Sequence, residues 1–162
     1  MRPHGREGKS MKPFVVLHVE DDEGDRAIVA AAFRKVAPDL VLKSVVDGAE
    51  AIHYLSGRGL YQDRERSPMP NLVLLDLKLP KMSGHEVLEW IRGHAHLKEL
   101  PVFMLTSSGD PADLHRATAL GVHSYLIKPV DLQATRDLVR GIGGYAAMTV
   151  ACAAAGGVPP KG

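Results

Sequence analysis

The stretch Asn71-Leu72-Val73-Leu74-Leu75-Asp76 decides the fold, because it is a short apolar run that ends in a carboxylate. Three further apolar runs also end in a chemically useful side chain: Phe14–Val19 before Glu20 and Asp21, Val102–Leu105 before Thr106, and Tyr125–Ile127 before Lys128. If these runs are parallel strands of one sheet, their carboxyl ends lie along one edge, where open α/β sheets bind ligands. The sequence therefore predicts a pocket that holds carboxylates, a hydroxyl group and a lysine.

Outward from this stretch, the chain alternates between strand and helix patterns. Apolar, β-branched runs predict strands at 15–19, 40–46, 72–75, 102–105 and 122–127, and helical spacing predicts helices at 25–36, 49–55, 84–92, 110–120 and 131–142. This alternation predicts an α/β fold, a doubly wound five-stranded parallel sheet with right-handed crossovers.

The same pass along the chain divides it into three parts. Residues 1–12 are basic and lack periodicity, so we expect a disordered leader there. Residues 13–145 form the folded domain. Residues 146–162 are rich in Gly, Ala and Pro and predict a flexible C-terminal tail, which leaves no room for an output domain. The polar segment 56–70 predicts a solvated surface loop.

Composition excludes several classes of partner. A net charge of +1 does not indicate a nucleic-acid footprint. No run approaches the ~20 apolar residues of a membrane span, so we expect no membrane contact. The single cysteine, Cys152, cannot form an intramolecular disulfide, which favours a reducing, cytoplasmic location.

The carboxylates predict a metal site. Taken singly, Asp21 or Asp22 could cap the following helix, and Asp76 could be a turn residue. Glu20, Asp21 and Asp76 brought together would repel one another unless a cation neutralised them. Hard oxygen ligands favour Mg²⁺, with Mn²⁺ as the alternative, over zinc.

The remaining groups suit phosphoryl transfer. A carboxylate that attacks phosphorus needs charge neutralisation and positioning more than proton chemistry. Lys128 supplies a fixed positive charge, and Thr106 supplies a neutral donor to a phosphoryl oxygen.

As a set, five motifs resemble those of the two-component response-regulator receiver domain: Val19-Glu20-Asp21-Asp22, Leu74-Leu75-Asp76, Leu79-Pro80, Leu105-Thr106-Ser107 and Lys128-Pro129. The resemblance covers about residues 14–142 and implies the flavodoxin-like receiver fold with strand order 2-1-3-4-5. The loop with Gly59-Leu60-Tyr61 resembles more narrowly the single-domain regulators associated with phytochrome-type histidine kinases.

The resemblance also implies roles for individual residues. It makes Asp76 the acceptor of phosphate from a sensor histidine kinase, with Mg²⁺ held by Asp21, Glu20, Asp76 and the backbone carbonyl of Lys78. Thr106 and Lys128 would hold the phosphoryl group, Tyr125 would be the aromatic switch, and Lys78 and Ser108 would tune hydrolysis. It further implies a cis peptide bond between Lys128 and Pro129.

The resemblance implies that the output is partner binding, to a downstream protein target or a phosphotransfer protein. One rival is a phosphohydrolase with Asp76 as nucleophile, but haloacid-dehalogenase-type enzymes carry an acid two residues later, where this chain has Lys78. Another is a pseudo-receiver that serves only protein contacts. Homodimerisation through the fourth helix, fifth strand and fifth helix, or through an apolar patch at Tyr145, Met148 and Val150, is a further hypothesis.

Overall fold

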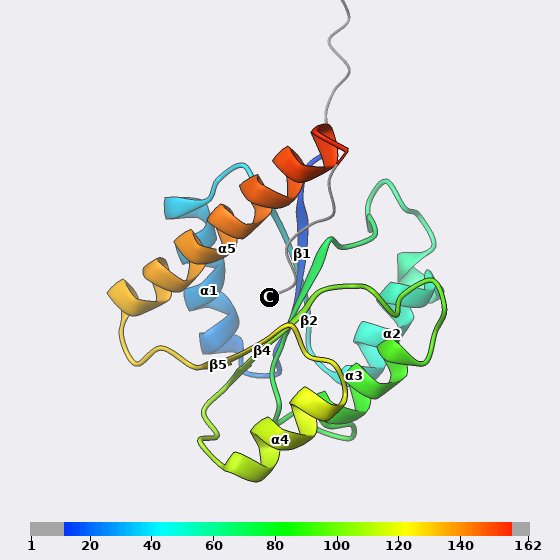
Figure 1. Cartoon of the computed structure of the whole chain (residues 1–162), viewed down its shortest axis with the longest axis vertical. Helices are drawn as coiled ribbons and strands as arrows, with labels where there is room; N and C mark the ends of the chain where they lie inside the picture. Colours follow the sequence, from blue (N-terminus) through cyan, green and yellow to red (C-terminus); the bar gives the residue numbers. More distant parts are fainter. Residues whose placement is uncertain (1–11, 157–162) are drawn as a thin grey trace, which may run out of the picture.

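The computed structural model describes residues 12–156, and its centre is one parallel sheet with helices on both faces (Figure 1). The strands are β1 (Val15–Val19), β2 (Val41–Val45), β3 (Leu72–Leu75), β4 (Val102–Thr106) and β5 (Ser124–Ile127). Their order across the sheet is β2-β1-β3-β4-β5, and every neighbouring pair is parallel. The predicted α/β class, strand number and strand order are confirmed.

Two helical layers enclose the sheet. The helices are α1 (Glu23–Val36), α2 (Gly48–Ser56), the 3₁₀ turn η1 (Gly59–Tyr61), α3 (Gly84–Arg92), α4 (Pro111–Ala119) and α5 (Leu132–Ala154). Helices α1 and α5 cover one face, and α2, α3 and α4 cover the other (Figure 1). None of the helices within residues 12–156 combines the length and the apolar character that crossing a bilayer requires.

Strand β3 shows why the strands at the centre of the sheet are rich in apolar residues. Its four residues are all fully buried, with Leu72 and Leu74 in the core beneath α1 and α5, and Val73 and Leu75 in the core beneath α2 and α3. Successive side chains of a strand point to opposite faces, so a strand that is covered on both sides is apolar on both faces, with His18 of β1 as an exception.

Each α-helix begins at a residue whose side-chain oxygen accepts a backbone N–H of the first turn. These residues are Asp22, Asp47, Ser83, Asp110 and Asp131. Such caps satisfy donors that have no partner inside the helix. Since Asp22 caps α1, the neighbouring Asp21 is not used for this purpose.

The segment between α2 and β3 is more ordered than a solvated loop. The Arg64 guanidinium donates hydrogen bonds to the carbonyl oxygens of Tyr54 (2.7 Å), Leu55 (3.0 Å) and Ser67 (3.1 Å). The Tyr54 hydroxyl donates to the Pro68 carbonyl at 2.8 Å. These bonds fasten the segment to the carboxyl end of α2, where helical carbonyls lack partners.

The last helix is longer than the sequence predicted. We expected a helix at 131–142, with residues 145–150 as a candidate extension and a flexible tail from residue 146, whereas α5 continues to Ala154. Tyr145 packs edge-on against Phe14 and Phe103, and Ala146 is buried in the same core. This packing outweighs the low helix propensity of Gly143 and Gly144.

Two other expectations concern the peptide bond before Pro129 and the two predicted terminal segments. All peptide bonds within residues 12–156 are trans, so the expected cis bond before Pro129 was wrong; trans is the form of lower free energy for X–Pro bonds, by about 0.5–1 kcal/mol. The predicted leader, apart from Lys12, and the end of the predicted tail from residue 157 lie outside the described residues.

Candidate functional site

Residues at or just after the carboxyl ends of four strands lie along one edge of the sheet. Val19 lies beside Leu75 in the register of β1 and β3, and the Asp76 N–H donates to the Val19 carbonyl at 3.1 Å. On the other side, the Lys128 N–H donates to the Thr106 carbonyl at 2.8 Å. Parallel pairing therefore brings Glu20, Asp76, Thr106 and Lys128 together, as predicted.

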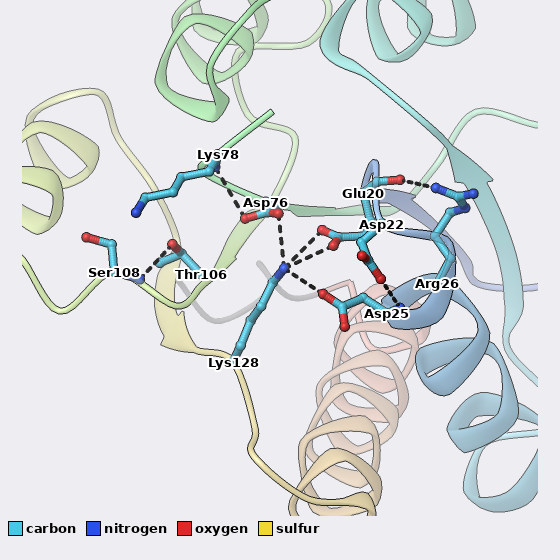
Figure 2. Close-up of polar contacts among 9 residues, drawn as sticks. All are labelled: Glu20, Asp22, Asp25, Arg26, Asp76, Lys78, Thr106, Ser108 and Lys128. Atoms are coloured by element: carbon cyan, nitrogen blue, oxygen red, sulfur yellow. Dashed lines mark hydrogen bonds and ion pairs between the residues drawn. The ribbon is translucent and has the colours of Figure 1, made fainter. Parts of the chain in front are cut away.

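The ammonium group of Lys128 is the centre of the site (Figure 2). Its Nζ lies 3.1 Å from Oδ2 of Asp76 and 3.0 and 3.2 Å from the two carboxylate oxygens of Glu20. A third carboxylate, that of Asp25, lies 3.1 Å away. The ammonium is therefore shared by three acids that come from two strand ends and one helix.

Asp25 was not among the residues predicted for this site. It places its carboxylate on Lys128 from the first turn of α1, three residues after the cap Asp22, whose Oδ1 accepts the Asp25 N–H at 2.7 Å. The available signal was its spacing: once Asp22 is taken as the cap, Asp25 follows by about one helical turn and lies near the strand end that carries Glu20.

Burial and charge shift the titration of this cluster. Glu20 is 1% exposed, and burial, together with the neighbouring Asp76, raises the pKa of its carboxyl well above the ordinary value. For Lys128, desolvation lowers the pKa of the amine, but its bonds to Glu20, Asp76 and Asp25 outweigh this and raise the pKa. Desolvation likewise opposes, but does not overcome, the hydrogen bonds from Lys128 and Glu20 that lower the pKa of Asp25.

A metal ion fits the acids beside this ammonium. Oxygen atoms of Glu20, Asp21 and Asp76 all lie within 4.8 Å of one another, and Asp21 is exposed. Three carboxylate oxygens with an open side to water match the preference of Mg²⁺ and Mn²⁺ for hard ligands and retained water. The geometry therefore brings together the three carboxylates that were predicted to bind metal.

Lys78 makes its hydrogen bond to Asp76 through its backbone. Its N–H donates to Oδ1 of Asp76 at 3.3 Å, while its side chain points away from Asp76 (Figure 2). The predicted roles of the Lys78 carbonyl in metal binding and of its side chain in hydrolysis stay predictions.

The segment after β4 joins Thr106 to the aromatic residue of β5. Thr106 is fully buried, and its Oγ1 accepts the N–H of Ser108 at 3.1 Å. The Tyr125 hydroxyl donates to the Ser108 carbonyl at 3.1 Å, and the Ser108 hydroxyl donates to Asp113 at 2.6 Å. A movement of Thr106 would thus reach Tyr125 through two hydrogen bonds, although the switch role of Tyr125 stays a prediction.

A glycine allows the turn that holds Asp76. The N–H of Gly84 donates to the Leu77 carbonyl at 2.8 Å. A Cβ atom on Gly84 would lie 2.8 Å from Cα of Leu77 and closer still to the carbonyl oxygen of Asp76. The first turn of α3 therefore packs directly against the backbone of Asp76, which only glycine permits.

His18 lies beneath the cluster on β1. It is 2% exposed, and burial lowers the pKa of its imidazole to about 4. Its Nδ1 is the single buried side-chain polar atom in residues 12–156 that lacks a hydrogen-bond partner, and His18 borders a cavity of about 230 Å³ between α1 and α5.

Comparisons with known proteins agree with this geometry. Residues 16–140 match the family described as the response regulator receiver domain. The chain is 38% identical over 147 residues to the response regulator Rcp1 of Synechocystis sp., which covers 91% of this chain and 98% of that protein.

Two solved structures have the same fold. The phosphorylated cyanobacterial phytochrome response regulator RcpA superposes with a TM-score of 0.77 at 32% identity, over 85% of this chain and 96% of that one. The Mn²⁺-bound form of Rcp1 superposes with a TM-score of 0.73 at 38% identity, over 83% of this chain and 94% of that one.

Proposed function

The chain belongs to the response regulator receiver domain family and is homologous to phytochrome-associated response regulators, and from this premise we propose that Asp76 accepts a phosphoryl group from a sensor histidine kinase. The observation that carries the proposal is the 3.1 Å contact between Lys128 Nζ and Asp76 Oδ2, beside a group of carboxylates that fits a divalent cation.

The transfer is an exchange of bonds at phosphorus. A carboxylate oxygen of Asp76 attacks, a new O–P bond forms, and the N–P bond of the kinase phosphohistidine breaks, so that the imidazole leaves with its electron pair. Negative charge on the equatorial phosphoryl oxygens is the main electrostatic demand. Lys128 lies where its ammonium can meet part of that charge, and the Thr106 hydroxyl can donate to another oxygen.

We propose Mg²⁺, with Mn²⁺ as a substitute, as the cofactor of this step. Glu20, Asp21 and Asp76 would hold the ion, which supplies charge neutralisation when bound. The Mn²⁺-bound homologue supports this assignment.

The proposed output is a change of partner binding, without turnover of a substrate. Phosphorylation would attract the Thr106 hydroxyl, which accepts a hydrogen bond from the Ser108 N–H. A movement of Thr106 would then shift the hydrogen bond between the Ser108 carbonyl and the Tyr125 hydroxyl. Homology to phytochrome response regulators favours a phytochrome-type kinase as donor, and we propose a cytoplasmic location. Dimerisation stays a hypothesis: Met148 is half exposed, but Tyr145 packs into the core.

The experiment is phosphorylation with acetyl phosphate and Mg²⁺, followed by intact mass measurement. The wild-type chain should gain one acid-labile phosphate, and Asp76→Asn should gain none. Asp39→Asn, an exposed aspartate in the turn before β2, is the matched control and should label like the wild type. Labelling that survives Asp76→Asn would refute the assignment. Sustained release of phosphate from p-nitrophenyl phosphate would instead favour the phosphohydrolase.

A further inference from the structure

The Lys128 ammonium has more acidic partners than the proposed transfer uses. It can donate three hydrogen bonds, and its contacts already reach Glu20, Asp76 and Asp25. A phosphoryl oxygen that binds Lys128 must therefore displace one of these carboxylates.

Asp25 differs from the other two acids in position and exposure. It lies on α1, outside the group of carboxylates that fits a metal ion. Its side chain is 46% exposed, whereas those of Asp76 and Glu20 are 7% and 1% exposed. Water can replace the ammonium at Asp25 more readily than at the buried acids, because a buried carboxylate without a partner is costly.

The three acids also surround the ammonium unevenly. Figure 2 shows Glu20 and Asp25 on the α1 side of Lys128, with Thr106 on the opposite side of Asp76. A phosphoryl group on Asp76 that also contacts Thr106 would lie away from α1. The attraction of Asp25 therefore pulls the Lys128 ammonium away from the position in which it would contact the phosphoryl group.

We propose that Asp25 is a positioning residue that holds the Lys128 ammonium on the α1 side of the site and competes with the phosphoryl group for it. The inference rests on the proposed function. It makes α1 a determinant of how readily the acceptor is phosphorylated, through one ion pair that breaks when the phosphoryl group arrives.

The test measures the affinity of the full chain for beryllofluoride, a mimic of the phosphoryl group, in saturating Mg²⁺ by calorimetry. Asp25→Asn should bind about three- to fivefold more tightly than the wild type, which is the range of a partly exposed ion pair. Glu23→Gln removes the same charge from the same turn of α1, at an exposed residue outside the Lys128 cluster, and is the matched control. It should change the affinity less than twofold.

The dependence on Lys128 separates positioning from a general effect of charge. In a Lys128→Ala background, Asp25→Asn should no longer tighten binding, since the competing ammonium is gone. Equal affinities of Asp25→Asn and wild type would overturn the inference, as would a gain that persists without Lys128. Failure of the wild type itself to bind beryllofluoride would count against the proposed function instead.

Discussion

The Nζ atom of Lys128 lies 3.1 Å from Oδ2 of Asp76, although the two residues are 52 positions apart in the chain. Both follow the last residue of a parallel strand, with β4 between them in the sheet. The contact therefore depends on the register of three strands, and it reports whether the site is assembled.

Replacement of Asp76 should stabilise the metal-free protein. Burial is the main cause of the raised pKa of Glu20 and Asp76 adds to it, while a single ammonium, that of Lys128, faces these acids, so the folded state retains unfavourable repulsion. We expect Asp76→Asn to increase the free energy of unfolding by about 1 kcal/mol in urea titrations with EDTA. Asp39→Asn should leave it unchanged, and a loss of stability in Asp76→Asn would contradict this account.

Magnesium should stabilise the folded wild-type protein by offsetting the repulsion between these carboxylates. An ion that binds only the folded state adds about 1.4 kcal/mol for each tenfold excess over its dissociation constant. The melting temperature of the wild type should rise with Mg²⁺, and chelation of the ion by added EDTA should lower it again. Asp21→Asn should lose most of the rise, while Glu23→Gln should keep it. An equal rise in Asp21→Asn would exclude Asp21 as a ligand.

Gly84→Ala should disrupt the acceptor turn. The new methyl group would overlap the backbone of Asp76 and Leu77, which cannot move away as a flexible side chain would. We expect a loss of about 2–4 kcal/mol in unfolding free energy together with slower phosphorylation. Gly144→Ala is the control: it lies within α5 with open space around it, and should stabilise the protein by up to about 1 kcal/mol.

Arg64 should hold the segment between α2 and β3. Arg64→Gln removes three hydrogen bonds to backbone carbonyls, so amide hydrogen exchange across residues 57–67 should accelerate about tenfold or more. Arg66→Gln, an exposed arginine in the same segment, should leave exchange near the wild-type rate. Equal exchange in the two variants would show that Arg64 does not fasten the segment.

Stability should fall in alkaline solution through Tyr54. Burial raises the pKa of its hydroxyl from 10.0 to about 12, so between these values the unfolded chain has lost a proton that the folded chain keeps. The unfolded state then binds fewer protons, and stability declines as pH rises from 10 to 12. At pH 11 the wild type should lose about 1 kcal/mol more than Tyr54→Phe, compared with pH 8. Parallel losses would contradict the shift.

Much of the fold could be predicted because its strands are covered on both faces. Strand β3 is buried and apolar at every position, so its end is marked by the first polar residue, Asp76. Glu20 and Lys128 also follow apolar runs, although the buried His18 interrupts the run before Glu20. These residues could be identified without knowledge of side-chain packing.

Other features depend on packing that the sequence does not display. The extension of α5 through Gly143 and Gly144 depends on contacts of Tyr145 with two aromatic rings from other elements. Arg64 resembles its neighbour Arg66 in sequence, yet only the fold shows that it reaches the carbonyls of α2. Asp25 could be placed only once the capping residue of α1 was known.

Lys128 belongs to the segment after β5, which is synthesised after the other four strands of residues 12–156. A nascent molecule that has emerged only as far as β4 holds Glu20, Asp25 and Asp76 without the Lys128 ammonium that pairs with them. Under the proposed function, Asp76 therefore gains the ammonium that faces it only when the segment after β5 has joined the sheet.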